Sequence, residues 1–372
     1  MRCFRSNLTR SITPWRFVVA FVLVYSTTFY LLARKLSESE PDRLLPLDDN
    51  VPESKEEQNQ DDRNGVEPDG ENAPAQPSKP FISHIVEVGT LNTENYRCYL
   101  KDENGELLSL WHDIPLYPEG DASNNVYNIV VETPRFSNPR LELCHTEPMN
   151  PIVHTYNSDG TLSYAENVFP FTGYPFNYGY FPQTYTDPNQ RSDNQPAPGD
   201  GDLVDAIDIS QHTRKTGEVV KVKVLGALAF IVENRLDWKI VCVDVNDPLT
   251  QKIKEVYQLE FVMPGIIRAI HEFFYLFKVP RRGGVTPIAF KGSYRKVEVV
   301  NQILSVSHSL WRNVITQKQP GISSDTVIET RHPDGVVQAN PEKWQSIVAK
   351  APPKTKPAPM PDYVNTYFYP RI

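Results

Sequence analysis

The sequence predicts a mainly β domain of the α+β class, a barrel or sandwich with helices packed outside, preceded by one transmembrane helix. Strand-like runs and turns fill the first two-thirds of the domain, and helical patterns come only after them. Strands followed by helices are typical of helices packed against a closed or layered sheet. A separate apolar run near the N-terminus predicts the transmembrane helix.

Residues 1–36 form a basic N-terminal segment, with six arginine or lysine residues and no acid. Within it, residues 15–33 are almost all apolar, which is about the length that crosses a hydrocarbon core of roughly 30 Å. More arginines precede this run than follow it, so the positive-inside rule predicts a single-pass membrane protein with a cytosolic N-terminus (type II). Mitochondrial targeting is the alternative, because arginine-rich, acid-free N-termini are also typical of transit peptides.

Residues 37–80 are predicted to form a disordered linker, because they hold 13 acids and four bases but few apolar residues.

The rest of the chain is divided into a domain at 81–317 and a proline-rich C-terminal extension at 318–372. The domain is mildly acidic, so we expect no nucleic-acid partner. The cysteines show no zinc spacing and predict no disulfide framework.

Four runs predict strands of the domain core. Residues 125–132 are rich in β-branched and aromatic residues, and residues 219–224 alternate with period two. Residues 225–232 and 238–245 are apolar runs that predict buried strands. The aromatic, Gly- and Pro-rich passage at 168–188 has no periodicity and is interpreted as a packed loop.

Two helices are predicted late in the chain. Residues 264–278 and 294–315 both repeat apolar residues at helical spacing. The extension at 318–372 is predicted to be mostly extended and to dock back on the domain through Tyr367–Tyr369.

The Gly-rich turn Pro198–Asp205 carries the strongest chemical signal of the chain. Asp200, Asp202 and Asp205 lie within six residues, and the glycines let the backbone bend so that the acids converge. Convergent carboxylates are suitable ligands for Mg²⁺ or Ca²⁺. A solvated turn is the alternative reading, whereas an EF-hand is excluded because Gln211 stands where its last ligand must be an acid.

Further acids and bases fall within strand-like runs. Glu132 and Glu142 stand at spacings that allow one shared face, and Asp237 and Lys239 are two apart and so face the same way. Two common motifs are not complete. The run 271–275 lacks the second histidine of a zinc-protease helix, and no P-loop is present.

Five motifs in this order and spacing resemble the family I soluble inorganic pyrophosphatases of the eukaryotic type. The resemblance extends from about Gly89 to Trp311. The motifs are Val131–Arg135, Asn177–Thr184, Gly199–Asp205, Asp237–Lys239 and Asp244–Pro248.

The resemblance implies a five-stranded, OB-like β-barrel with flanking helices, which hydrolyses pyrophosphate to two phosphates with several Mg²⁺ ions. By position, Asp200, Asp205 and Asp237 would hold the metals that carry the attacking hydroxide. Asp202 would be the base that takes a proton from the water. Glu142 would serve an outer metal.

The resemblance also implies a set of phosphate-binding side chains. These would be Arg140, which replaces a lysine of the family, with Tyr178, Lys239 and Lys278. Glu132 would support the polar lining of the site.

The sequence departs from the family at several site positions. Glu166 stands where the family has a phosphate-binding arginine, Val232 replaces a metal-binding aspartate, and Phe277 replaces a tyrosine. Arg235 is one candidate to offset the charge of Glu166. Glu233 is expected to lie in a strand and to point away from the site.

Two functions of different classes follow. The first is an Mg²⁺-dependent inorganic diphosphatase, because the residues implied for attack on phosphorus are intact. The second is a catalytically impaired binding or scaffold protein, because the substrate side has changed. Another phosphoanhydride as substrate and a homodimer remain open alternatives.

Overall fold

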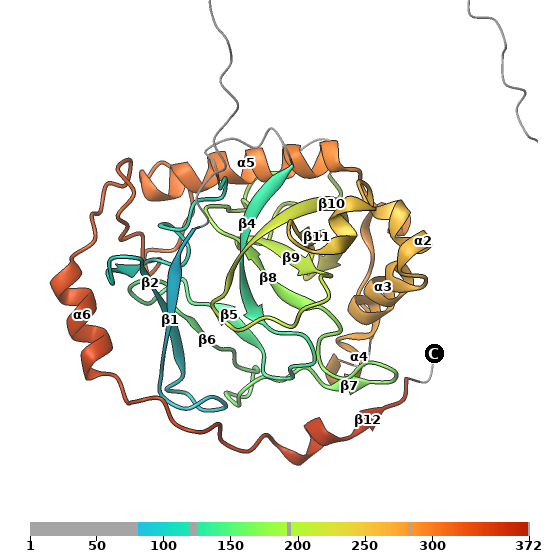
Figure 1. Ribbon diagram of the computed structural model, residues 1–372, viewed down its shortest axis with the longest axis horizontal. Helices are drawn as coiled ribbons and strands as arrows, with labels where there is room; N and C mark the ends of the chain where they lie inside the picture. The colour runs from blue at the N-terminus through green and yellow to red at the C-terminus, as the bar shows by residue number, and fades with distance from the viewer. Residues whose placement is uncertain (1–80, 119–124, 192–194, 283, 371–372) are drawn as a thin grey trace, which may run out of the picture. The chain divides into compact units, whose positions relative to one another are not determined.

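The computed structural model describes residues 81–118, 125–191, 195–282 and 284–370 (Figure 1). The predicted transmembrane span and the acidic linker lie outside the described residues. Within the ranges that are described, no helix is both long and apolar enough to cross a membrane.

Five strands pair in the order β10-β11-β9-β8-β4, and β4 pairs again with β10, so the ring closes into a barrel. Within the barrel, the β9–β11 pair is parallel and the other four pairs are antiparallel. The prediction of a mainly β domain is confirmed. The barrel strands are β4 (Val126–Thr133), β8 (Asn177–Phe181), β9 (Val204–Asp208), β10 (Val219–Val232) and β11 (Arg235–Asp244).

The hairpin β10–β11 corrects two sequence predictions. The runs 219–224 and 225–232 form one 14-residue strand, with an irregular register between Val224 and Gly226. Glu233 and Asn234 have φ of 51° and 62°. Two consecutive left-handed residues are typical of the tight turn that joins twisted antiparallel strands, so Glu233 lies in the turn and not in a strand.

Strand β8 lies inside the passage that was predicted to be a loop, and that prediction is wrong there. Four of its five residues are buried, so the strand shows no alternation of apolar and polar residues. A side chain at Gly179 would come within 1.9 Å of the carbonyl oxygen of Val130, so glycine lets β8 approach β4. Strand β7 (Asn167–Val168) also lies at the start of this passage.

A second sheet stands beside the barrel, in the order β1-β2-β6-β5, with β3 paired to β2. Its last strand carries Glu142, flanked by two buried leucines. This edge places Glu142 near barrel strand β4. The strands are β1 (Ser83–Val88), β2 (Arg97–Asp102), β3 (Leu107–Leu108), β5 (Leu141–Leu143) and β6 (Ile152–His154).

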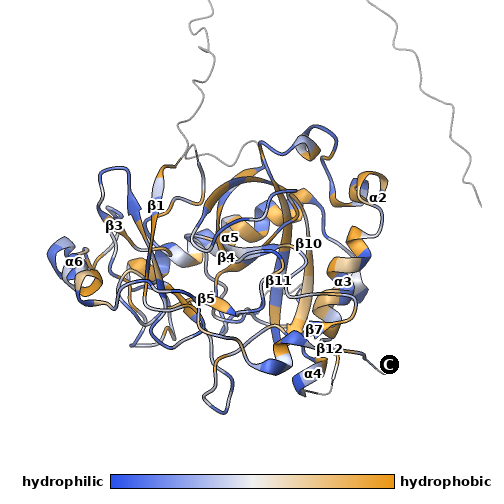
Figure 2. Ribbon diagram, turned by 60° about the horizontal axis from the view of Figure 1, so that its bottom comes forward, coloured by the Kyte–Doolittle hydropathy of each residue, from blue (hydrophilic) through white to orange (hydrophobic). Residues whose placement is uncertain are grey.

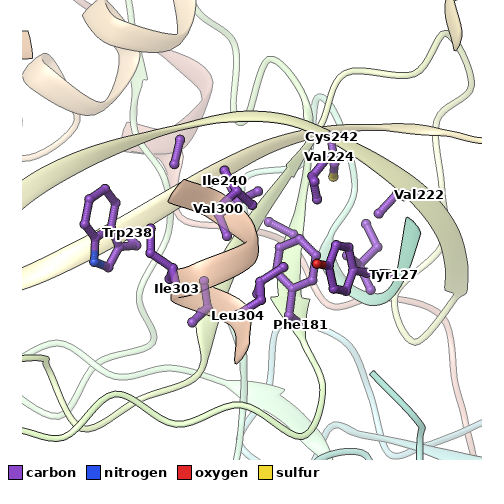
Figure 3. Packing of buried hydrophobic residues seen from close by; sticks show 14 of the residues in the cluster. Tyr127, Phe181, Val222, Val224, Trp238, Ile240, Cys242, Val300, Ile303 and Leu304 are labelled. Atoms are coloured by element: carbon purple, nitrogen blue, oxygen red, sulfur yellow. The ribbon is translucent and has the colours of Figure 1, made fainter. Parts of the chain in front are cut away.

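Helices cover the barrel, as predicted, with slightly shorter bounds. In Figure 1, α5 (Val297–Ile315) lies along one side, while α2 (Leu259–Val262) and α3 (Ile266–Leu276) lie along another. Figure 3 shows the apolar face of α5 against barrel residues, and Figure 2 shows hydrophobic residues along the barrel strands and α3. The remaining short helices are α4 (Val279–Arg282), η1 (Pro248–Gln251), η2 (Val256–Gln258), η3 (Ala289–Gly292) and η4 (Asp362–Asn365).

The C-terminal extension contains one helix, α6 (Pro341–Lys350), that the prediction of a mostly extended segment did not include. Asn340 caps the helix by accepting a hydrogen bond from the Lys343 amide at 3.0 Å. Trp344 is buried against the domain. Further on, β12 (Tyr367–Phe368) pairs in parallel with β7.

Candidate active site

A cavity of about 200 Å³ opens beside the barrel strands β8, β9 and β11. Acids and bases from strands, the Gly-rich turn and the end of α3 meet there. The ten residues to which the sequence analysis gave a role in the site all line this cavity: Glu132, Arg140, Glu142, Tyr178, Asp200, Asp202, Asp205, Asp237, Lys239 and Lys278.

The Gly-rich turn folds tightly against the segment before it. Gly201 has φ of +86°, and a side chain at Gly199 would come within 2.7 Å of the Thr186 side chain. Thr186 Oγ1 donates a hydrogen bond to Asp200 Oδ1 at 2.6 Å. The amide of Asp202 donates to the same oxygen at 3.2 Å. The glycines therefore allow the close packing that holds Asp200 in place.

Lys239 joins the carboxylates of the two parallel strands. It lies opposite Asp205 in the β9–β11 register and on the same face of β11 as Asp237. Its Nζ donates to Asp237 Oδ1 at 2.7 Å, to the Tyr178 hydroxyl at 2.8 Å, and to Asp205. Burial lowers the pKa of Lys239, but the Asp205 and Asp237 charges outweigh it and raise the pKa above its ordinary value. Lys239 is therefore charged.

Negative charge exceeds positive charge around this lysine. Desolvation, followed by repulsion from Asp237 and Asp202, raises the pKa of Asp200 to about 7. Burial also raises the pKa of Asp205 well above its ordinary value, although Lys239 opposes the shift. Crowded carboxylates with raised pKa values are stabilised by added positive charge.

These oxygen atoms fit a hard divalent cation by their chemistry, because Mg²⁺ takes carboxylate and water oxygens. Among the described residues, however, no three histidine, cysteine or acidic side chains are already grouped as a metal site. Lys239 explains part of this absence of a metal-like group, because its amine binds both Asp205 and Asp237.

Glu132 is buried beneath the cavity. Its Oε1 accepts a hydrogen bond from the Leu143 amide at 2.8 Å, which ties β4 to β5. Burial, then repulsion from Glu142 and Asp205, raises the pKa of Glu132 well above its ordinary value. Glu132 and Glu142 therefore lie close together, as their spacing predicted.

His145 is a site residue that the sequence analysis missed. Its Nε2 lies 2.9 Å from Asp202 Oδ1, and its ring packs against Trp111 with centroids 4.5 Å apart. Burial would raise the pKa of Asp202, but His145 outweighs it and lowers that pKa. A single histidine in a loop carries no spacing signal, so only the fold reveals this contact.

The phosphate side of the cavity is built from less regular elements. Arg140 Nη2 lies 2.6 Å from Glu142 Oε1, and its guanidinium lies 5.5 Å from the centre of the Phe277 ring. Arg140 Nε is buried and has no hydrogen-bond partner within the described ranges. Phe277 therefore lacks the hydroxyl of a tyrosine but supports the arginine through its ring.

The substituted positions lie in different places. Val232 lines the cavity, whereas Glu166 does not. Glu166 Oε1 instead pairs with Arg281 Nε at 2.7 Å. The suggestion that Arg235 offsets Glu166 is wrong, because Arg235 Nη1 donates to the Pro188 carbonyl oxygen.

Comparisons with known proteins agree with this site. Residues 129–312 match the family model described as inorganic pyrophosphatase. A Drosophila melanogaster protein named inorganic pyrophosphatase is 36% identical over 289 residues, which cover 77% of this chain and 84% of the relative. The chain belongs to the inorganic pyrophosphatase family. The family predicted from the five motifs is therefore confirmed, and the relatives are named as enzymes.

Solved structures of the pyrophosphatase family also match the chain. The inorganic pyrophosphatase of Schistosoma japonicum aligns with a TM-score of 0.71 and 32% identity, over 77% of this chain and all of that one. A truncated vacuolar soluble pyrophosphatase of Trypanosoma cruzi, solved in complex with PPi, aligns with a TM-score of 0.58 and 30% identity. That match covers 68% of this chain and 98% of the other.

Proposed function

We propose that this protein hydrolyses inorganic pyrophosphate to two phosphates in the presence of Mg²⁺. The observation that carries the proposal is the cavity itself, where six carboxylates meet Arg140, Lys239 and Lys278. Acids suit metals and an attacking water, while arginine and lysine suit phosphate oxygens. Family membership supports the same activity.

The size of the cavity favours a small substrate. Its volume is about 200 Å³, below the roughly 300–1,000 Å³ that is usual for sites of drug-sized ligands. Pyrophosphate therefore suits the cavity better than a nucleotide or another large phosphoanhydride.

Asp202 is the proposed general base. It takes a proton from the attacking water, while His145 at 2.9 Å fixes one of its carboxylate oxygens. The other oxygen is then left to face the water. Turnover depends on this orientation because in-line phosphoryl transfer is mostly a matter of positioning and charge stabilisation.

Asp200, Asp205, Asp237 and Glu142 are the proposed Mg²⁺ ligands. Bound Mg²⁺ lowers the pKa of water and neutralises phosphate charge. Cations held by these acids would balance their negative charge. Lys239, which lines the same cavity, would pair with a phosphate oxygen.

The remaining side chains hold the substrate. Arg140 and Lys278 neutralise phosphate oxygens, and the unpartnered Nε of Arg140 is a donor for one of them. Tyr178 donates from its hydroxyl. Glu132 supports Glu142 and β5 from below.

Phosphate release tests the proposal. The full chain is incubated with pyrophosphate or ATP, each with Mg²⁺ and with a chelator. We expect release from pyrophosphate that exceeds release from ATP and stops with the chelator. Equal release from both substrates would contradict the assignment of substrate, and release that resists the chelator would contradict the metal.

A catalytically impaired binding protein is the second candidate, because Val232 and Phe277 line the cavity in place of an acid and a tyrosine. Calorimetric titration with Mg²⁺ and pyrophosphate separates the two. Binding with no phosphate release would favour the second candidate.

The proposal includes attachment to a membrane through residues 15–33, with the N-terminus cytosolic, and keeps mitochondrial targeting as the alternative. Alkaline extraction of cell membranes and protease protection of the C-terminal domain test the attachment and its orientation. Sedimentation of the detergent-solubilised chain tests whether it forms a homodimer.

A further inference from the structure

A second cavity, of about 390 Å³, lies behind the Gly-rich turn, between β11, η3 and α5. Its walls include apolar side chains from all three elements: Leu236, Trp238, Phe290, Ile303 and Val306. In Figure 3, Trp238 and Ile303 lie at one edge of the core cluster. The volume falls within the range of sites for small organic molecules.

The backbone beneath this cavity adopts an unfavourable conformation. Phe290 and Lys291 both have left-handed dihedral angles, with φ of 52° and 57°. This region is sparsely populated by bulky side chains, and such residues gather at sites that clamp a ligand. Here the conformation stacks the Phe290 ring against Trp238, with centroids 5.5 Å apart and planes at 22°.

Arg295 lies over the same ring, with its guanidinium carbon 4.1 Å from the Phe290 centroid. Two backbone hydrogen bonds, at 2.9 and 2.7 Å, hold Arg295 beside Ala227 of β10. Within the described ranges, its guanidinium forms no ion pair and no hydrogen bond. The arginine is thus held at an apolar cavity with its charge available to an anion.

Asp187 is the acid in the lining, but its oxygens are already engaged. One accepts a hydrogen bond from the Asn189 amide at 2.8 Å, and the other from Gln319 Nε2 at 3.0 Å. The Asp187 carboxylate keeps its charge, but both of its oxygens are held by Asn189 and Gln319. The Arg295 guanidinium is the charged group whose donors remain open to a ligand.

We propose that this cavity binds a small organic anion with an aromatic body, which packs against Trp238, Phe290 and α5 while its anionic group pairs with Arg295. Aromatic walls favour a flat apolar body. A guanidinium favours a carboxylate, sulfonate or phosphate group.

The cavity also touches the rear of the active-site turn. Thr186 and Gly199 line it, and Thr186 Oγ1 donates to Asp200 at 2.6 Å. Leu236, another lining residue, donates from its amide to the Pro198 carbonyl oxygen at 2.8 Å. A ligand here contacts the groups that hold Asp200, so its binding changes turnover; this part rests on the proposed function.

The probe for the binding site is 8-anilinonaphthalene-1-sulfonate, an aromatic anion whose fluorescence rises in apolar surroundings. It is titrated into the full chain and into Arg295→Gln, Val306→Asp and Arg268→Gln. Val306 is 59% exposed, so its replacement does not disturb the core, and Arg268 is an exposed arginine on α3. Circular dichroism confirms the fold of each variant.

We expect saturable binding that weakens about tenfold, or 1.4 kcal/mol, in Arg295→Gln and Val306→Asp and is unchanged in Arg268→Gln. The neutral probe N-phenyl-1-naphthylamine should not distinguish Arg295→Gln from the wild type. Absence of binding, or equal binding by all variants, would overturn the site.

Pyrophosphate hydrolysis with and without the anionic probe tests the coupling. We expect the probe to change kcat in the wild type and to have a much smaller effect in Arg295→Gln. Unchanged turnover at saturating probe would overturn the coupling. Absence of any hydrolysis would contradict the proposed function, while the fluorescence titration would still decide the binding site.

Discussion

The acid side and the phosphate side of the cavity differ in how the fold holds them. Asp205, Asp237 and Lys239 project from β9 and β11, two adjacent strands of the barrel in a fixed parallel register. Arg140 precedes a three-residue strand, and Phe277 follows the last turn of α3. The first set is held by a continuous hydrogen-bonded sheet, and the second by element ends.

The departures from the family pattern that the sequence analysis inferred follow this difference. They fall on the 166 loop, the end of α3 and Val232 at the end of β10, and none is inferred for the acids on β9, β11 and the Gly-rich turn. At these positions the side chains have local partners: Glu166 pairs with Arg281, and Phe277 lies beside the Arg140 guanidinium. Within the barrel, by contrast, one side chain contacts several others, as Lys239 binds Asp205, Asp237 and Tyr178.

The largest combined effect on turnover and stability is expected from breaking the acid side at Lys239. In Lys239→Met, Asp205 and Asp237 lose their shared cation. We expect phosphate release to fall by about 10²–10³-fold. The free energy of unfolding should also fall by about 3–5 kcal/mol, because buried charges are left unpaired.

Denaturant unfolding with and without Mg²⁺ checks the second part, and Mg²⁺ should restore some of the stability. Lys343→Met on α6 is the matched control, because that lysine is exposed and pairs with Glu329. Wild-type stability in Lys239→Met would contradict the central place given to this lysine.

A smaller loss is expected from His145→Gln. The histidine touches the proposed base and not the substrate, so kcat should fall roughly tenfold, less than a general base contributes, while KM stays constant. His212→Gln, at an exposed position, serves as the control. Steady-state kinetics with pyrophosphate separate the two constants, and a rise in KM alone would show that His145 acts on the substrate.

Val232→Asp tests the less regular side of the cavity, because it places a carboxylate in the cavity lining. We expect the Mg²⁺ concentration for half-maximal phosphate release to fall severalfold, because an added acid strengthens a divalent-cation site. Val232→Asn has a similar shape without the charge. Equal Mg²⁺ dependence of the two variants would contradict a metal role for this position.

The smallest effect is expected at Glu166 and Arg281. Glu166→Arg should cost about 0.5–1 kcal/mol of stability, since it places two cations together on a partly exposed pair. Glu166→Arg with Arg281→Glu should restore it. A double-mutant cycle by thermal unfolding measures the coupling, and additive effects would show that the pair contributes nothing.

Much of the fold was accessible from the sequence, because β10 and α5 each carry a clear periodicity. Strand β8 was not, because burial on both faces removes the alternation that marks a strand. Helix α6 was also missed, because proline-rich flanks obscured the cap at Asn340 and the proline in the first turn.

The contacts of the site likewise divide into those that the sequence predicts and those that only the fold reveals. The acids of the Gly-rich turn and Asp237 with Lys239 are close in sequence, so local spacing predicted their convergence. The contacts of His145 with Asp202 and of Arg281 with Glu166 join residues 57 and 115 positions apart. No local pattern encodes such pairs; they follow from how the strands and loops meet in the fold.

The most direct test is phosphate release from Mg²⁺-pyrophosphate by the full chain beside Asp202→Asn. The replacement keeps the size of the side chain and removes its basicity, and Asp159→Asn, in an exposed turn, is the matched control. We expect release by the wild type and the control, and a fall of about 10²–10⁴-fold in Asp202→Asn. Equal release by wild type and Asp202→Asn, with both folded, would contradict the account of the acid side.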